Sequence, residues 1–425
     1  MKRFLILFFF LIPVFRVIAQ DTITLDYCYR QAEKNYPLAK QTNLYEASND
    51  LRIKNLNKNY LPSLNLNASA SLQSDVTSVS LNLPKNFPAV SFPSPDKDQY
   101  KVTLDVNQSI YDGNVTSYQK KIEKFNLQAD QKNVGIQLYQ LKDQVNQLYF
   151  TIFFLQENEN LLKNSREKIE AKRKEMRSSV ENGTQLQASV DVLDAEIIQI
   201  DQQLAGISTD RSATFKMLSE LISAPVSESA HLKLPDITIS AFNYENHRLE
   251  YELFDVQQGR INLMKNMVTS KWNPKIFAFG QAGYGKPGFN MLSNDFTTFW
   301  IFGGKLTWNF WNWNQNKNEK KSYDIQNQIV LTQKETFDKN LRITAEKNLS
   351  EIIKLSDMLS KDEELINLRT RITKTASSQL DNGVITSSDY ISRINEEIQA
   401  EMNKELHRIQ LVRAKLNYLF TLGKL

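Results

Sequence analysis

The chain has 425 residues, of which 24% are charged and 41% hydrophobic, and it contains only 13 Gly and 11 Pro. This composition excludes a disordered tail, and the scarcity of chain breakers excludes a fold with many loops. The formal net charge of +4 falls to +1 without the first nineteen residues, which hold three basic residues and no acidic one. Such a balanced charge provides no basic field, so we expect no nucleic-acid partner.

The N-terminus has the pattern of a secretory signal peptide. Lys2 and Arg3 give a positive start, residues 4–14 form an apolar run, and Ala19 is a small residue suited to cleavage. We therefore predict a signal peptide over residues 1–19. An uncleaved anchor is disfavoured because the run is too short to span about 30 Å. No later segment has about 18 consecutive apolar residues, so a mature chain that crosses a membrane is expected to use strands.

Four segments alternate apolar and polar residues, which is typical of strands with one apolar and one wet face. The alternation is clearest in Leu64-Asn65-Leu66-Asn67. The predicted bounds are about 63–74, 100–111, 275–285 and 299–311. Each segment has about the length of a tilted strand that crosses a bilayer. Four strands cannot close a barrel, and open edges are not tolerated in lipid, so other chains must close it; three copies would give twelve strands.

Aromatic residues gather at the ends of these predicted strands. Tyr111 ends the second strand, and Trp308, Trp311 and Trp313 lie at the end of the fourth. Such residues are typical of the girdles of transmembrane barrels, and we predict that these four lie at a membrane interface. The alternative is a packed soluble core, which is disfavoured because no amphipathic helix lies close enough in sequence to cover the sheet.

Two heptad patterns predict long coiled-coil helices. Apolar residues over 134–155 are spaced alternately by four and three, and the same spacing returns over 190–207. A helix over residues 114–180 would extend roughly 100 Å at 1.5 Å per residue. The chain is therefore expected to contain one helical hairpin around residue 183.

The two halves of the sequence read as copies, in step at roughly two hundred residues. Glu181-Asn182-Gly183 recurs as Asp381-Asn382-Gly383. We predict two structural repeats, 20–224 and 225–425, which together form one intertwined domain. Each has a short helix, two strands, a very long helix, a Gly turn and a returning helix. Gly183 and Gly383 suit the left-handed position that ends a helix, and Thr184 and Thr386 are predicted to cap the returning helices.

A series of short motifs runs through the chain in a fixed order. They are Ile23-Thr24-Leu25 with Ala32 and Pro37, Leu61-Pro62-Ser63-Leu64, Ser109-Ile110-Tyr111-Asp112-Gly113, Gly183 with Asp191-Val192-Leu193-Asp194-Ala195, Arg248-Leu249-Glu250, Asn273-Pro274, Gly383 with Asp389-Tyr390, and Leu419 with Leu422-Gly423. In this order of motifs the chain resembles the TolC family of outer-membrane efflux proteins across nearly all of the mature sequence.

The resemblance implies a homotrimer in which a twelve-stranded β-barrel, with four strands from each chain, lies in the outer membrane and continues as a long coiled-coil α-helical barrel in the periplasm. It also implies a passive exit duct for tripartite efflux or type I secretion. The partners would be a periplasmic adaptor (membrane fusion protein) and an inner-membrane pump of the resistance-nodulation-division or ABC type. No cofactor is expected. The alternative is a periplasmic coiled-coil scaffold or adaptor whose strands form a soluble sandwich.

Acidic residues ring the pore of the family just after the second-repeat turn. Asp389 falls on one such position, and Ser392 replaces the next acidic residue, one helical turn later. Ile385 stands where the family has a basic residue. A ring of three carboxylates would favour cations and raise its own pKa. The alternative is that the tip aspartates only favour the positive N-terminal ends of their helices. The residues predicted to form the tip turns and to dock an adaptor are Gly183, Thr184, Asp191, Asp194, Gly383 and Thr386.

Residue types that carry enzyme chemistry are scarce. His231, His247 and His407 have no spacing that would build a zinc or catalytic site, and His247 and His407 are predicted to be solvated. No Gly-rich phosphate loop precedes a helix. Cys28 is the single cysteine and is expected to be a buried or partly exposed thiol. We therefore predict that the protein is not an enzyme.

Overall fold

The computed structural model describes residues 22–79, 93–239 and 244–425. The predicted signal peptide and part of the predicted loop between the first two strands lie outside these residues. The described chain divides into two compact units. The helical unit comprises the residues up to Ala39, Ile136–Arg248 and Lys339–Leu425, and the sheet unit comprises Lys40–Gly135 and Leu249–Asp338. Each of the predicted repeats thus contributes to both units.

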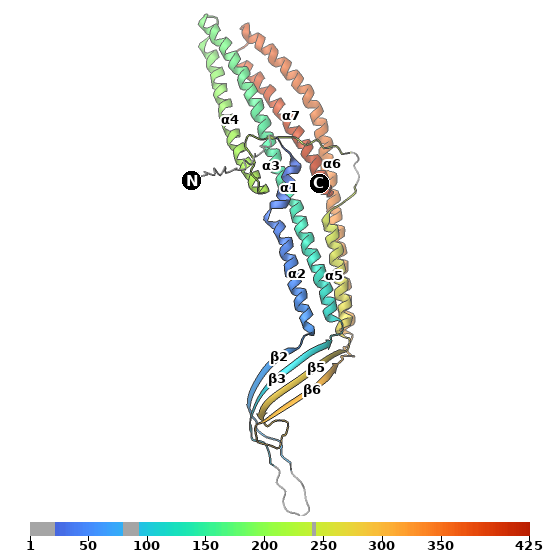
Figure 1. Ribbon diagram of the computed structural model, residues 1–425. Coiled ribbons are helices and arrows are strands. Elements are labelled where there is room, and N and C mark those ends of the chain that lie inside the picture. The colour runs from blue at the N-terminus through green and yellow to red at the C-terminus, as the bar shows by residue number, and fades with distance from the viewer. Residues whose placement is uncertain (1–21, 80–92, 240–243) are drawn as a thin grey trace, which may run out of the picture. The chain divides into compact units, whose positions relative to one another are not determined.

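The sheet unit contains four antiparallel strands in the order β2-β3-β5-β6, with β2 and β6 at the edges (Figure 1). The strands are β2 (Ser63–Leu72), β3 (Asp98–Tyr111), β5 (Lys275–Lys286) and β6 (Thr297–Thr307). The helices of this unit are α2 (Gln41–Asn57), α5 (Leu249–Lys271) and the first parts of α3 (Val115–Glu181) and α6 (Gln315–Asp381).

The last strand is shorter than the sequence alternation indicates. Thr307 pairs with Lys275, the first residue of β5. Pro274 precedes Lys275 and lacks a backbone N–H group, so it cannot donate a further ladder hydrogen bond. The aromatic run that begins at Trp308 therefore follows the strand and lies outside its ladder.

The helical unit contains two long hairpins. The first pairs the remainder of α3 with α4 (Gln187–Ile222), and the second pairs the remainder of α6 with α7 (Ser387–Thr421). α3 and α6 each have 67 residues, or about 100 Å at 1.5 Å per residue. The unit also holds α1 (Leu25–Asn35) and a short parallel ribbon of β1 (Thr22–Ile23) and β4 (His231–Leu232).

The heptad positions of α3 and α4 supply much of the core of this unit. Val145, Ile152, Ile169 and Leu193 are all fully buried. The buried residues form clusters along the hairpins, because a seam with alternating spacings of three and four keeps one stripe of each helix against its neighbours. Cys28 is buried in the cluster around α1, and burial raises the pKa of its thiol to about 12, so it is an unreactive core residue.

None of the helices in the described part of the chain combines the length and apolarity that crossing a membrane requires.

Candidate functional site: the sheet surface and the hairpin tips

The strand register assigns the side chains of the sheet to two faces. Leu66 lies opposite Leu104, Leu104 opposite Ala282, and Ala282 opposite Trp300, so these four residues form one row across the sheet. Every second residue along each strand shares their face. We call it the apolar face. Its apolar members are Leu64, Leu66, Ala68, Ala70, Leu72, Tyr100, Val102, Leu104, Val106, Ile276, Ala278, Ala282, Tyr284, Trp300, Phe302 and Leu306, and it also holds Asp98, Gln108, Gly280, Lys286, Thr298 and Gly304.

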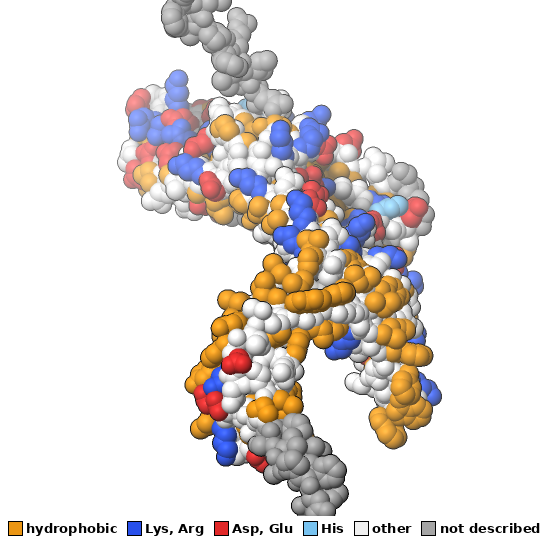
Figure 2. Space-filling view, turned by 60° about the horizontal axis from the view of Figure 1, so that its bottom comes forward, with side chains coloured by type: hydrophobic (Ala, Val, Ile, Leu, Met, Phe, Trp, Pro, Cys, Tyr) orange, Lys and Arg blue, Asp and Glu red, His pale blue; other side chains and the backbone are white. Residues whose placement is uncertain are grey.

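The apolar face is uncovered in the single chain. Leu66 is 75% exposed, Trp300 69% and Phe302 75%. Figure 2 shows hydrophobic side chains gathered around the sheet, where few charged side chains appear. A contiguous apolar surface of this kind marks a membrane or protein contact. The apolar residues that alternate in the sequence thus do lie on one exposed face.

The opposite side of the sheet, which we call the polar face, carries amides, hydroxyls and charges. At its centre the carboxylate of Asp105 accepts hydrogen bonds from Asn67 Nδ2, from Gln281 Nε2 at 2.5 Å and from Thr103 Oγ1 at 3.1 Å. The face also carries Phe279 and Phe299. Their rings lie over Gly303 and Gly283, where an added Cβ atom would be within about 3.0 Å and 2.5 Å of ring carbons.

The four aromatic residues predicted to contact a membrane interface are all exposed. Tyr111 is 36% exposed, Trp308 57%, Trp311 65% and Trp313 84%. The rings of Trp311 and Trp313 meet edge to face at 5.6 Å. They all lie at the end of the sheet where β3 and β6 finish and the long helices begin. Rings with apolar faces and polar N–H or O–H groups suit such an interface.

A second aromatic group lies at the other end of the sheet. Phe296 stacks with Tyr100 at 6.3 Å and with Tyr284 at 5.5 Å. The eight residue steps along β5 from Ile276 to Tyr284 measure about 26 Å, close to the apolar band of about 25 Å in transmembrane barrels. Sequence reasoning missed this group, although Tyr100 and Tyr284 stand near the starts or ends of alternating segments.

The first hairpin tip is formed by a left-handed glycine. Gly183 has φ +74°, its N–H donates to Val180 O at 2.9 Å, and the N–H of Thr184 donates to Ser179 O at 2.9 Å. This hydrogen-bond pair is the Schellman motif. The prediction that Thr184 caps α4 is wrong. Its hydroxyl donates back to Ser179 O at 2.8 Å, and Leu186 occupies the N-cap position without a side-chain hydrogen bond.

The second tip repeats the glycine turn and adds a side-chain cap. Gly383 has φ +69°, and the N–H groups of Gly383 and Val384 donate to Leu380 O and Gln379 O. Thr386 is the N-cap of α7 and forms a reciprocal capping box with Asp389. Thr386 N donates to Asp389 Oδ2 at 3.0 Å, and Asp389 N donates to Thr386 Oγ1 at 3.2 Å.

The capping box stabilises the ionised form of Asp389. Hydrogen bonds from the Thr386 side chain and backbone hold the pKa of Asp389 below its ordinary value. Donors to a carboxylate favour its ionised form, which explains the lowered pKa in the single chain. The rise expected for a ring of three carboxylates concerns the trimer and stays a prediction. Asp389 is exposed and shares a groove of about 700 Å³ between α6 and α7 with Ile385, Arg371 and Arg393.

The other predicted tip residues lie apart from this groove. Ser392 is exposed on α7 and does not line it. Asp191 accepts a hydrogen bond from Gln187 at 2.9 Å at the start of α4. Asp194 accepts one from Arg173 Nη1 at 2.8 Å, which joins α4 to α3.

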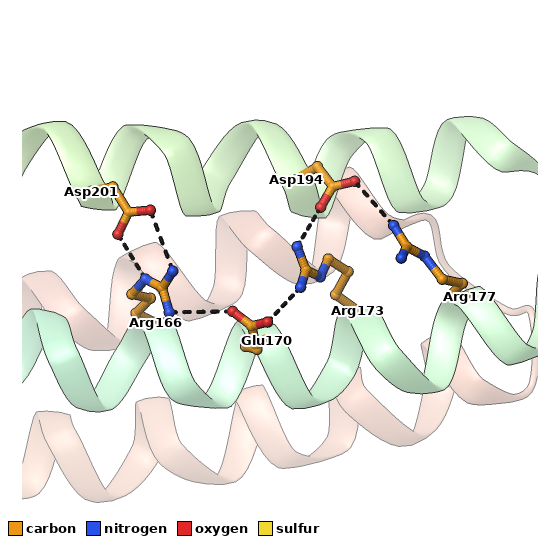
Figure 3. A network of polar contacts seen from close by, with 6 residues as sticks. All are labelled: Arg166, Glu170, Arg173, Arg177, Asp194 and Asp201. Carbon is orange, nitrogen blue, oxygen red and sulfur yellow. Dashed lines mark hydrogen bonds and ion pairs between the residues drawn. The ribbon is translucent and has the colours of Figure 1, made fainter.

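Asp194 belongs to a ladder of charges along the first hairpin (Figure 3). Arg173 also contacts Glu170, which pairs with Arg166, and Arg166 reaches Asp201 of α4 at 2.7 Å. The ion pairs Arg173–Asp194 and Arg166–Asp201 each join a basic residue of α3 to an acidic residue of α4. The ladder cross-links the two helices outside their apolar seam.

A buried lysine joins the two hairpins. The side chain of Lys172 on α3 is 7% exposed, and its ammonium donates to Asp381 at 2.8 and 3.0 Å and to Glu175 at 2.8 Å. It also lies 5.9 Å from the ring of Tyr390 on α7. Asp381 ends α6 immediately before the second turn. Sequence reasoning missed this contact, because it joins residues 209 positions apart.

One of the predictions for the histidines is wrong. His407 was expected to be solvated, but its Nδ1 lies 2.6 Å from Asp362 Oδ2, and both side chains are largely buried between α6 and α7. This pair links the helices of the second hairpin. Within the described residues, no group of three or more His, Cys, Asp or Glu side chains is placed to hold a metal ion.

Comparison with solved structures establishes the fold. The chain is similar to the outer membrane protein VceC of Vibrio cholerae, with 13% identity, a TM-score of 0.66 and coverage of 94% of this chain and 96% of VceC. The CmeC outer membrane channel of Campylobacter jejuni gives 12% identity, a TM-score of 0.65 and coverage of 94% and 85%. The open state of the Neisseria gonorrhoeae MtrE outer membrane channel gives 16% identity, a TM-score of 0.65 and coverage of 94% of this chain and 88% of MtrE. No curated protein sequence matches significantly.

A four-stranded sheet with an exposed apolar face, joined to two long helical hairpins, defines the class of TolC-like channel proteins. Residues 28–222 match the family model described as outer membrane efflux protein. Over these residues the chain matches the outer membrane efflux proteins, and the fold of the described chain is that of the TolC-like channels. The channels of this family are transport proteins without enzymatic activity.

Proposed function

We propose that three copies of this chain form the exit duct of a tripartite efflux or type I secretion system. The three sheets close into a twelve-stranded barrel in the outer membrane, and the long helices form an α-helical tunnel in the periplasm. Residues 1–19 act as the signal peptide that directs export. A periplasmic adaptor and an inner-membrane pump, of the resistance-nodulation-division or ABC type, supply the energy, and this chain acts as a passive conduit.

The open sheet with its uncovered apolar face carries this proposal. β2 and β6 are both edge strands, so each presents backbone groups that lipid cannot satisfy. The four strands are antiparallel throughout, so β6 of one copy can pair antiparallel with β2 of the next. Closure by sister sheets satisfies both edges, while the apolar face meets lipid and the polar face meets water.

The presence of two helical hairpins in each chain favours the proposed helical tunnel. Three chains with two hairpins each would supply six similar hairpins, as expected from two structural repeats over 20–224 and 225–425. The exposed aromatic groups at both ends of the sheet would lie at the two membrane interfaces, with Tyr111, Trp308, Trp311 and Trp313 on the periplasmic side.

Asp389 is the proposed gate residue, with Ser392 facing the pore one turn further along α7. Its carboxylate is ionised and exposed, and three copies would place three negative charges at the narrow end. Asp389→Asn should weaken cation selectivity in planar bilayers, whereas Asp191→Asn on α4 is the matched control. Equal selectivity of Asp389→Asn and the unmodified protein would refute the gate role.

The hairpin tips are the proposed docking surface for the adaptor. They comprise Gly183, Thr184, Asp191 and Asp194 on the first hairpin and Gly383 and Thr386 on the second. Each turn also presents an apolar side chain, since Leu186 is 76% and Val384 68% exposed. Val384→Ser should reduce co-purification of the adaptor, with exposed Ile353 on α6, changed to Ser, as the control. Unchanged co-purification would count against this surface.

The runner-up function is a periplasmic coiled-coil scaffold or adaptor. The two functions differ in what they predict for the purified mature chain. An exit duct should fractionate with the outer membrane and migrate as a trimer that heating converts to monomer. A chain found only in the periplasmic fraction, as a monomer that needs no detergent, would refute the duct.

A further inference from the structure

The polar face of the sheet has an unequal distribution of charge. The register places Lys101 opposite Ser69, Lys305 opposite Phe277, and Lys275 opposite Thr307, all on the polar face. Asp105, opposite Gln281, is the one acidic strand residue on this face. Three lysines against one aspartate give a net charge of +2 for each chain.

These lysines are not neutralised by neighbouring carboxylates. In the described ranges no carboxylate oxygen lies within 4.0 Å of the ammonium groups of Lys101, Lys275 or Lys305, and Lys101 instead lies 4.9 Å from the ring of Phe299. Asp105 accepts hydrogen bonds from the neutral donors Asn67, Gln281 and Thr103, and Lys101 acts on it as a nearby charge without a direct ion pair. The positive excess is therefore not cancelled inside the sheet.

Lys286 provides the contrast within the same sheet. It lies opposite Tyr100, so it shares the parity of the apolar face, and it stands at the last position of β5. Its ammonium forms an ion pair with Asp96 at 2.5 Å. The lysine on the apolar side is thus paired, while the three lysines on the polar side are not.

We propose that the inner wall of the outer-membrane barrel is an anion-attracting lining, formed by Lys101, Lys275 and Lys305, which favours the passage of anionic solutes through the membrane section of the channel. This inference rests on the proposed closure of three sheets with the polar face inward. It assigns to the barrel a preference opposite in sign to that of a carboxylate ring at the hairpin tips.

The size of a twelve-stranded barrel makes this charge effective. Twelve strands about 4.8 Å apart and tilted by about 40° give a circumference of roughly 75 Å and a backbone radius of roughly 12 Å. Side chains reduce the open radius further, so the lumen lies within about one Debye length, 10 Å at 0.1 M salt, of the lining. At 1 M salt the Debye length is only about 3 Å, so salt screens the charge of the lining from most of the lumen.

The test measures the reversal potential of the reconstituted full-length channel in a KCl gradient centred near 0.1 M. Lys101→Gln with Lys305→Gln lowers the net lining charge from +2 to 0 per chain, and should shift the anion-to-cation permeability ratio at least roughly twofold toward cations. Lys305→Gln alone, whose exposed side chain has no packing role, should give a smaller shift of the same sign. Asp105→Asn should shift the ratio toward anions.

Lys286→Gln is the matched control, because it removes the same charge from the apolar face of the sheet. It should cause no comparable shift in the permeability ratio. All shifts should fade at 1 M KCl. A conducting trimer whose reversal potential is the same in the lysine variants and the unmodified protein overturns the anion-attracting lining and leaves the duct intact. Failure of the unmodified protein to form conducting trimers overturns both.

Discussion

Lys172 offers a direct test of what holds the two hairpins together near their tips. Its ammonium is buried, whereas its two partners are more open: the side chain of Asp381 is 50% exposed and that of Glu175 is 64% exposed. Burial lowers the pKa of Lys172, but hydrogen bonds to Asp381 and Glu175 outweigh it, so the pKa is raised overall. The lysine therefore depends on its partners more than they depend on it.

Because the lysine is more buried than its partners, removing a carboxylate should destabilise the contact more than removing the lysine. Asp381→Asn leaves a buried ammonium with one remaining carboxylate and removes two charge-assisted contacts, which should cost about 1.5–3 kcal/mol. Lys172→Met keeps an apolar stem of similar volume and leaves both carboxylates hydrated, which should cost less than about 1 kcal/mol.

Hydrogen exchange at the second turn measures this difference locally, and it avoids the unfolding of a whole oligomer. Asp381→Asn should accelerate exchange of the Gly383 and Val384 amides roughly ten- to hundredfold, since 1.4 kcal/mol is a factor of ten. Lys172→Met should accelerate it less than about fivefold, and Asp191→Asn, whose carboxylate contacts Gln187, should leave it unchanged. Equal acceleration by Asp381→Asn and Lys172→Met would refute the reasoning from burial.

Three further predictions concern the hairpins. Thr386→Ala should destabilise the start of α7 by about 1 kcal/mol. It should also raise the pKa of Asp389 toward 3.8 in an NMR titration. Because the pKa of Asp389 is depressed in the folded chain, the stabilisation by its carboxylate is present above pH 3.8 and is lost as pH falls through the folded pKa. An unshifted titration would contradict this. Leu193→Ala should cost about 2–5 kcal/mol in thermal unfolding, because Leu193 is 0% exposed. Gly383→Val should destabilise its turn, where φ is +69°, and accelerate local amide exchange, whereas Gly206→Val in α4 should not, because an added Cβ atom there meets open space. Unchanged amide exchange around Gly383→Val would argue otherwise.

The heptads made the long helices predictable from sequence, because a spacing of three and four residues has a direct geometric meaning. Val145, Ile152 and Leu193 occupy heptad positions and are fully buried. Alternation likewise predicts that Leu64 and Leu66 share a face, since side chains alternate along a strand. The pairing of β3 with β5 was not predictable in the same way, because it joins residues more than a hundred positions apart.

The contacts around the tips depended on long-range geometry and local competition. Thr386 lies three residues after Gly383, at the N-cap of α7, where Asp389 completes a capping box. Thr184 directly follows Gly183, and Leu186 holds the matching N-cap position of α4, so Thr184 lies two residues too early to cap that helix. His407 lies on an amphipathic helix, but its partner Asp362 is on another helix, so no local pattern revealed the pair.

The surroundings of the two faces of the sheet provide the most direct test of the central claim. Nitroxide labels at Leu66 and Phe302 on the apolar face, and at Asn67 and Lys305 on the polar face, can be compared in reconstituted vesicles by their collision rates with oxygen and with a water-soluble nickel chelate. We expect the first pair to be reached mainly by oxygen and the second mainly by nickel, because lipid and water lie on opposite sides of the sheet. Equal nickel access at neighbouring Leu66 and Asn67 would contradict a sheet that forms the wall of a membrane channel.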